Sequence, residues 1–203
     1  MINDHIKNDR VELVVMQEAK DSASFCGDSY YCITTESYFL CVLADGLGSG
    51  EFAFVSSNAV IEVVKKHHDL PLDELIAICN EQLANKRGAA VAIMRVFFDR
   101  DEFEIVSVGN IRFFLFLPSE KKLIYPLPVT GFLSGKSKKF KVETYRREKD
   151  SKFILFSDGM VVKGVKSKLS EHNIPLKCVG EELWSENTAQ ADDITMIIGS
   201  LLQ

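Results

Sequence analysis

The chain has 203 residues, 46% of them hydrophobic and 26% charged, which is typical of one compact globular domain spanning residues 1–203. Its net charge of −5 argues against a nucleic-acid partner, because nucleic-acid binders normally present a basic surface. No run reaches the ~18 consecutive apolar residues that a membrane span needs, so we expect no membrane partner either.

The N-terminal segment and the cysteines indicate where the chain works. Residues 1–10 are polar and lack the apolar core of a secretory signal. The five cysteines include no Cys-x-x-Cys pair, which disfavours a disulfide framework or a zinc site. We therefore expect a cytoplasmic protein. We also expect a monomer.

The N-terminal half contains apolar strands followed by segments of helical period. Val11–Gln17 is predicted as a strand, and Tyr30–Thr35 and Tyr38–Ala44 as a hairpin. Glu51–His68 and Leu72–Lys86 then carry apolar residues at spacings of three and four, which predicts two helices.

From residue 89 onward the chain is rich in Val, Ile and Phe, which favours strands joined by short polar or glycine turns. Val161–Glu186 is more polar and is predicted to hold one or two short helices before a final strand, Ile194–Leu202. Strands, two helices, many strands, helices and a strand, in that order, favour an α+β fold over a regularly alternating one. The other strands predicted in this half are Ala89–Phe98, Glu102–Val108, Ile111–Leu117, Lys122–Leu127, Lys139–Tyr145 and Lys152–Ser157.

Carboxylates stand at the boundaries of these strands. Asp45 follows the apolar run 39–44, and Asp158 follows the run 153–157. A carboxylate directly after a buried strand is costly unless it is paired or bound to a metal. Gathered carboxylates also repel one another unless a cation neutralises them. Two further acidic sites lie at element boundaries, Gly27-Asp28 and Asp192-Asp193.

We predict that folding assembles these carboxylates into one hard divalent metal centre. Oxygen-only ligands favour Mg²⁺ or Mn²⁺ over zinc or copper, and Gly46 lacks a Cβ, so its carbonyl can approach an ion closely. Two such ions ~3.5–4 Å apart can clamp a phosphate for in-line attack by water. The alternative for each Asp-Gly pair taken singly is an ordinary turn or helix cap.

Two glycine-rich segments only superficially resemble phosphate loops. Gly46-x-Gly48-x-Gly50 is not the Gly-x-Gly-x-x-Gly of dinucleotide sites. The segment 131–137 is one residue short of a Walker loop and lacks the helix that should follow it. We therefore predict no nucleotide site, and no serine–histidine or cysteine–histidine pair indicates a protein nucleophile.

Six short motifs occur in order between Cys26 and Ile198. They are Gly27-Asp28, Asp45-Gly46-x-Gly48, Arg87-Gly88-Ala89-Ala90, Gly109-Asn110, Asp158-Gly159 and Asp192-Asp193-Ile194-Thr195. In this order they resemble the motifs of the metal-dependent serine/threonine phosphatases of the PPM (type 2C) superfamily, and most of all its small bacterial SpoIIE-like branch. The resemblance implies a four-layer αββα sandwich of two antiparallel sheets with a binuclear Mn²⁺ or Mg²⁺ centre.

The resemblance also implies roles for individual residues. Asp45 would bridge the two metals and Gly46 would give its carbonyl. The family's Asp-Asn-x-Thr motif aligns its metal aspartate with Asp192, so Asp193, in the Asn position, is the second choice as a ligand. The implied catalytic set is Asp28, Asp45, Asp158 and Asp192, and the implied metal ligands are these four with Gly46 and Asp193.

Two family features are missing. The arginine that holds the substrate phosphate in eukaryotic members matches a position near Ala23, and the histidine proposed as a general acid is replaced by Leu47. The resemblance leaves open which group binds the phosphate and which protonates the leaving oxygen. Arg87, Lys86 and metal-bound water are the candidates.

The implied activity is that of a protein serine/threonine phosphatase, a phosphoric monoester hydrolase in which the ions neutralise charge on the transferring group. Within its branch the chain is similar to phosphatases of the general-stress sigma-B pathway. This implies phosphorylated stressosome-type regulators (RsbS-like and RsbR-like) as substrates and partners, and negative feedback on stress signalling. The alternative is a catalytically silent module of the same fold that docks to a regulatory partner, which is disfavoured because every aspartate position is filled. A metal-dependent nuclease is a weaker alternative, disfavoured by the acidic charge.

Overall fold

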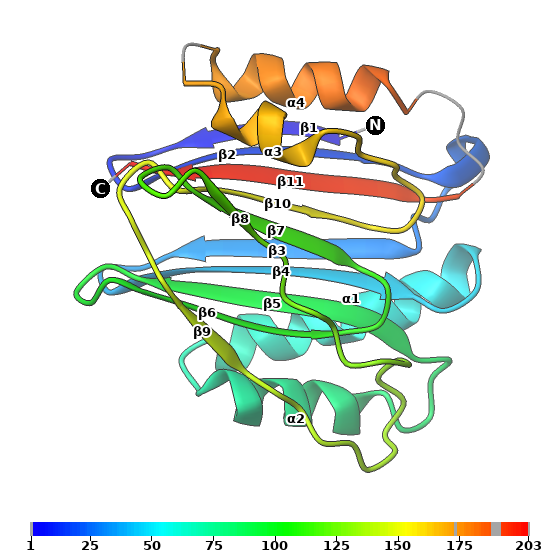
Figure 1. Ribbon diagram of the computed structural model, residues 1–203. Helices are drawn as coiled ribbons and strands as arrows, with labels where there is room; N and C mark the ends of the chain where they lie inside the picture. Colours follow the sequence, from blue (N-terminus) through cyan, green and yellow to red (C-terminus); the bar gives the residue numbers. More distant parts are fainter. Residues whose placement is uncertain (1, 173, 188–191, 203) are drawn as a thin grey trace. The chain divides into compact units, whose positions relative to one another are not determined.

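The computed structural model describes residues 2–172, 174–187 and 192–202 (Figure 1). The chain forms two compact units, each built from separated stretches. Unit 1 comprises Met1–Ser22, Arg112–Pro126 and Arg147–Gln203, and unit 2 comprises Ala23–Ile111 and Leu127–Arg146. Each unit holds one antiparallel sheet with two helices on it. The expectation of a single domain over residues 1–203 stays a prediction.

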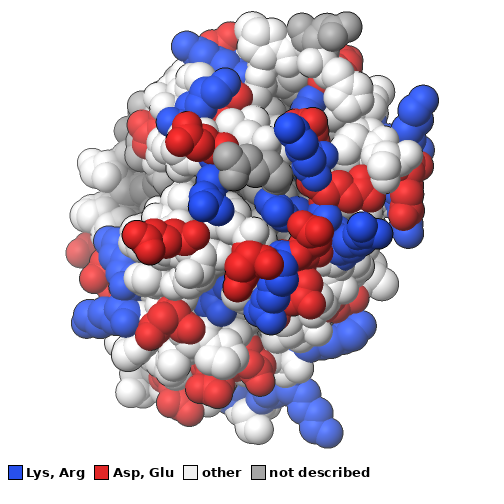
Figure 2. Space-filling model, turned by 90° about the vertical axis from the view of Figure 1, so that its left-hand side faces the viewer, with Lys and Arg blue, Asp and Glu red and all other residues white. Residues whose placement is uncertain are grey.

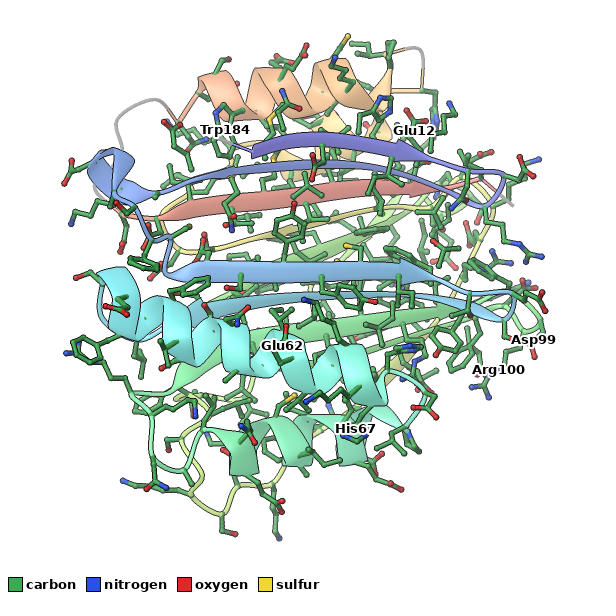
Figure 3. All side chains as sticks on the ribbon, turned by 180° about the vertical axis from the view of Figure 1, so that it is seen from behind. Glu12, Glu62, His67, Asp99, Arg100 and Trp184 are labelled. Carbon is green, nitrogen blue, oxygen red and sulfur yellow. The ribbon has the colours of Figure 1, made fainter. Side chains whose placement is uncertain are left out.

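Unit 2 contains a five-stranded sheet in the order β3-β4-β5-β6-β9. Helix α1 lies on β3 and β4, and helix α2 packs against α1 and β6 (Figure 1). Glu62 and His67 mark the second half of α1 in Figure 3. The elements are β3 (Asp28–Thr34), β4 (Tyr38–Gly46), α1 (Gly50–His67), α2 (Leu72–Gln82), β5 (Ala89–Phe97), β6 (Glu102–Val108) and β9 (Glu143–Arg146).

The alternation of side chains along β4 decides which face carries the acidic residue at its end. Leu40, Val42 and Ala44 are fully buried in the core that the sheet shares with α1 and α2. Because successive side chains of a strand point to opposite faces, Leu43 and Asp45 project from the face away from these helices.

Unit 1 contains a six-stranded sheet in the order β1-β2-β11-β10-β7-β8. Helix α4 lies on β2 and β11, and the short helix α3 contacts β7 (Figure 1). Its core includes Met16, Ile154, Leu183 and Met196. The elements are β1 (Ile2–Lys7), β2 (Val11–Glu18), β7 (Arg112–Leu117), β8 (Lys122–Ile124), β10 (Lys152–Phe156), α3 (Val165–Ser170), α4 (Leu176–Ser185) and β11 (Ile194–Leu201), with a 3₁₀ turn at Lys20–Ser22.

Strand β1 was not predicted, because its sequence is polar. It pairs with β2 at the edge of the sheet, where His5 and Lys7 contact Glu12 at 2.9 and 3.0 Å. Figure 3 labels Glu12. An edge strand with exposed, charged side chains has no apolar alternation that a sequence pattern could reveal.

Other elements are shorter than predicted. The strand expected over Lys122–Leu127 ends at Ile124, since the prolines at 126 and 128 cannot donate to a ladder. Within the segment expected as Lys139–Tyr145, Phe140 and Val142 pack against the core of unit 2 before the strand begins at Glu143. Alternation in this segment therefore reflects packing rather than strand pairing.

The described residues contain no helix that is both long and apolar enough to cross a membrane. All strand pairs in both sheets are antiparallel, which matches the α+β class expected from the sequence. On the face drawn in Figure 2, Lys and Arg side chains are interspersed with Asp and Glu. That distribution agrees with the acidic net charge and does not resemble the basic stripe of a nucleic-acid binder.

Candidate metal centre

Two predicted ligands face each other across neighbouring strands of unit 2. Asp28, the first residue of β3, is the direct register partner of Asp45 near the end of β4. Side chains at directly opposite positions of an antiparallel pair lie on the same face, and like charges placed so are destabilising. Asp28 is only 3% exposed, so water screens its charge poorly. This arrangement favours a bound cation.

Helix α1 packs directly on the residue that follows Asp45. A Cβ on Gly46 would collide with the backbone of Ala53 in the first turns of α1, so only glycine fits. The Gly46 N–H donates a hydrogen bond to the Gly27 carbonyl at 3.1 Å, which joins the two acidic motifs of this unit. Gly46 was predicted to bind an ion through its carbonyl oxygen. The close packing of α1 excludes a side chain at this position, so only backbone atoms of Gly46 can contact an ion.

A buried pair of hydroxyls fixes β3 beneath α1. The Ser29 and Ser57 Oγ atoms are 2.8 Å apart, and both residues are buried. Ser29 directly follows Asp28, so this contact positions the start of β3 and therefore the Asp28 carboxylate. A pair of serines within an otherwise apolar helix face was the available sequence signal for this contact, and it was not used in predicting the site.

The remaining predicted ligands come together in unit 1, where β10 ends beside the start of β11. Asp158 follows β10 and is exposed, and Asp192 and Asp193 precede β11. A Cβ on Gly159 would collide with the Asp193 carbonyl, so the turn after Asp158 lies directly against the backbone of the acidic pair.

Asp192 and Asp193 have different environments. Asp193 is 7% exposed, and its Oδ1 accepts a hydrogen bond from the Lys20 N–H at 2.9 Å. Asp192 is exposed, and its Oδ1 accepts a hydrogen bond from the Asp193 N–H at 2.9 Å. Asp193 therefore ties the segment after β2 to the start of β11, whereas Asp192 presents its carboxylate to solvent.

A buried polar network supports this end of the unit 1 sheet. Gln17 Nε2 donates to Thr195 Oγ1 at 3.0 Å, and the Thr195 N–H donates to Ser157 Oγ at 3.0 Å. All three residues are buried. Sequence reasoning did not assign Gln17 or Ser157, although a polar residue closing an apolar strand was the available signal.

The structure thus brings the predicted ligands together in two groups, one in each unit. Asp28 lies opposite Asp45 in unit 2, and Asp158 lies near the Asp192-Asp193 pair in unit 1. Over the described ranges 2–172, 174–187 and 192–202, no three His, Cys, Asp or Glu side chains gather closely enough to hold a metal ion. The donors at both places are carboxylate and carbonyl oxygens, which fit Mg²⁺ or Mn²⁺ by chemical type.

The family model described as "Stage II sporulation protein E (SpoIIE)" matches residues 35–200 of the chain. The chain belongs to the SpoIIE family. A curated relative, phosphoserine phosphatase RsbX from Bacillus subtilis (strain 168), is 37% identical over 195 residues, which cover 96% of this chain and 97% of the relative. A crystal structure of RsbX in complex with magnesium matches with a TM-score of 0.93 and 36% identity, covering 98% of this chain and 100% of that one.

A more distant structure shares the fold. The catalytic domain of the serine/threonine phosphatase PstP, in complex with two manganese ions, matches with a TM-score of 0.75 at 16% identity, covering 96% of this chain and 99% of that domain. The predicted resemblance to SpoIIE-like phosphatases is confirmed, as are the α+β fold of two antiparallel sheets and the assignment as a phosphatase. The RsbX structure is a complex with magnesium, one of the two ions that the resemblance implies.

Proposed function

We propose that this SpoIIE-family phosphatase removes phosphate from phosphoserine or phosphothreonine on stressosome-type regulatory proteins, with Mn²⁺ or Mg²⁺ held by its aspartates. The observation that carries the proposal is the register pairing of Asp28 with Asp45. Two carboxylates at directly opposite positions, one of them buried, repel each other, and a bound cation relieves that repulsion. A hard cation suits a substrate rich in oxygen.

We assign metal binding to Asp28, Asp45 and the Gly46 carbonyl in unit 2, and to Asp158 and Asp192 in unit 1. Asp193 is the second choice behind Asp192, because Asp193 is buried, whereas Asp192 is exposed. When bound, two such ions activate water and neutralise charge on the phosphoryl group. The chain itself orients these groups through the Gly46 contact with α1 and the network around Thr195.

The likeness to RsbX supports the choice of substrate class. RsbX is a phosphoserine phosphatase, and the chain matches it over nearly the full length of both proteins. We extend that activity to this chain and propose RsbS-like and RsbR-like phosphoproteins as its substrates and partners. Its role would be to reset sigma-B stress signalling from the cytoplasm, as a monomer.

The test is phosphate release from a phosphorylated RsbS-like or RsbR-like protein with and without Mn²⁺. We expect release by the wild type with metal, and its loss in Asp45→Ala and Asp158→Ala at unchanged circular dichroism. Glu62→Gln is the control, since Glu62 is an exposed carboxylate whose partner, Lys65, lies on the same helix. Full activity in both aspartate variants would contradict the assignment of these aspartates to a phosphatase metal site. An inactive wild type that binds the regulator without Mn²⁺ would instead favour a silent docking module.

A further inference from the structure

Unit 2 contains an exposed arginine near the end of the ladder that carries Asp45. Arg87 is in the loop before β5, where the Leu47 N–H donates a hydrogen bond to the Gly88 carbonyl at 3.0 Å. Asp45 pairs with Ala90 in the same ladder, so Arg87 is three positions from the partner of Asp45. Even a fully extended link of three residues spans no more than roughly 10 Å, a distance that an arginine side chain and a phosphate group together can bridge.

The Arg87 guanidinium is held in place by a ring and a backbone segment. Its Cζ lies 4.9 Å from the centre of the Phe52 ring in the first turn of α1. A Cβ on Gly48 would lie 2.5 Å from Arg87 Nη1, so the guanidinium packs against the loop that follows Asp45. Gly48 has a φ of +102°, which glycine adopts without strain, so this loop can present its backbone to Arg87.

Arg87 differs from an arginine held by a structural ion pair. Within the described part of the chain no carboxylate forms an ion pair with its guanidinium, and the residue is exposed. Arg100 also stacks on a ring, with its Cζ 3.7 Å from the centre of Phe97, but its Nε contacts Glu102 at 3.1 Å. When the flat face of a guanidinium stacks on a ring, the N–H groups at its edge can still donate hydrogen bonds to an oxyanion.

We propose that Arg87, oriented by Phe52, binds the phosphate group of the substrate. The proposal rests on the phosphatase function and names the group that grips the phosphate there. Asp28 and Asp45 repel a phosphate dianion, so a positive group beside the ions strengthens substrate binding. A planar guanidinium can donate two parallel hydrogen bonds to two phosphoryl oxygens, which a lysine ammonium cannot do.

Two exposed rings flank this arginine. Phe52 is 65% exposed, and Phe132, which is 43% exposed, lies against Gly88. Apolar surface gathered around a charged group is typical of a contact site for another molecule. We expect these rings to touch the protein segment that carries the phosphate, so that Phe52 both orients Arg87 and contacts the substrate protein.

The experiment measures phosphate binding separately from catalysis. Inorganic phosphate is titrated by calorimetry into the Mn²⁺-loaded wild type and into Arg87→Ala, Arg87→Lys and Phe52→Leu. Steady-state kinetics on the phosphoprotein are measured for the same set. Arg100→Ala is the matched control, because it removes an arginine stacked on a ring beyond the other end of β5.

We expect Arg87→Ala to weaken phosphate binding and to raise KM by about 10- to 100-fold, the loss typical of charge-assisted hydrogen bonds. Mn²⁺ affinity and Tm should stay at wild-type values. Arg87→Lys should recover only part of the loss, and Phe52→Leu should raise KM several-fold with little change in kcat. Arg100→Ala should match the wild type.

The outcomes separate this proposal from the function on which it rests. Wild-type phosphate affinity in Arg87→Ala would overturn the role of Arg87 and leave the phosphatase function standing. If the wild type is inactive but its phosphate binding still depends on Arg87, the phosphatase function is rejected, whereas the assignment of Arg87 to phosphate binding is kept. Arg87→Lys retains charge and stacking, so its loss of phosphate affinity supports the proposal even if Arg87→Ala fails to fold.

Discussion

Asp192 and Asp193 are adjacent carboxylates with unequal surroundings, and we propose separate roles for them. Asp193 is buried and accepts the Lys20 N–H, a role that an asparagine side chain can also perform. Asp192 is exposed and lies two residues before the start of β11. The geometry therefore supports Asp192 as the metal ligand and Asp193 as the residue that anchors the segment.

Exchange of each carboxylate for its amide should separate these roles. We expect Asp193→Asn to keep Mn²⁺ affinity and activity within a few-fold of the wild type. Asp192→Asn should lose about 100-fold or more, because losing a direct ligand costs at least as much as losing an outer-shell partner. Calorimetric Mn²⁺ titration and phosphate release check both variants, and the reverse order of the two losses would contradict the assignment.

At the scale of single residues, the sequence predicted the carboxylates but not their supports. Asp45 and Asp158 were recognisable because each follows an apolar run. Lys20 and Gln17 were not, since their partners are Asp193 and Thr195, more than 170 positions away in the chain. A backbone N–H that holds a distant carboxylate leaves no local pattern.

The link between α1 and α2 depends on a buried arginine from β5. Arg95 is 4% exposed, and its Nη2 donates to the His68 and Leu70 carbonyls at 2.7 and 2.6 Å. Its guanidinium also lies 5.0 Å from the centre of the Tyr38 ring. Burial lowers the pKa of Arg95 below its usual range, while the guanidinium remains charged at neutral pH.

We expect Arg95→Ala to lower the free energy of unfolding by about 3 kcal/mol, because two charge-assisted hydrogen bonds are lost and the Leu70 carbonyl loses the Arg95 donor, whereas the His68 carbonyl keeps the Tyr38 O–H at 3.1 Å. Urea unfolding at neutral pH measures the change. Lys65→Ala removes an exposed i,i+3 ion pair on α1 and a contact of its Nζ 5.8 Å from the centre of the Tyr31 ring, and should cost about 1 kcal/mol or less. Equal losses in the two variants would show that Arg95 does not stabilise the helix link.

Among the elements, those with an apolar face were predictable and the edge strands were not. Helices α1 and α2 and strands β4 and β5 follow the expected periods closely. Strand β1 was missed because it is polar and lies at a sheet edge, where pairing does not require apolar residues. Sheet membership of such strands is set by their partner rather than by their own sequence.

For the molecule as a whole, the gathered carboxylates should make stability depend on the metal. Binding to the folded state alone stabilises it by about 2.7 kcal/mol when the metal is at 100 times its Kd. We therefore expect Mn²⁺ to raise Tm in a concentration-dependent way and EDTA to reverse the rise. Asp45→Asn should abolish most of this shift, whereas Glu62→Gln on the exposed side of α1 should retain it (Figure 3). Differential scanning fluorimetry measures both, and an undiminished shift in Asp45→Asn would contradict the ligand assignment.

The way the two units share the chain sets an order of events during synthesis. Every strand of the unit 2 sheet lies between Asp28 and Arg146, so that sheet can form while the last part of the chain is still being translated. The unit 1 sheet is complete only when β11 has inserted between β2 and β10. The hydrogen bond from Gln17 to Thr195 likewise needs a residue that lies 178 positions later in the chain. The Asp28–Asp45 pair can thus be placed early during translation, whereas Asp158 and Asp192 reach their positions in unit 1 only after β11 has been translated.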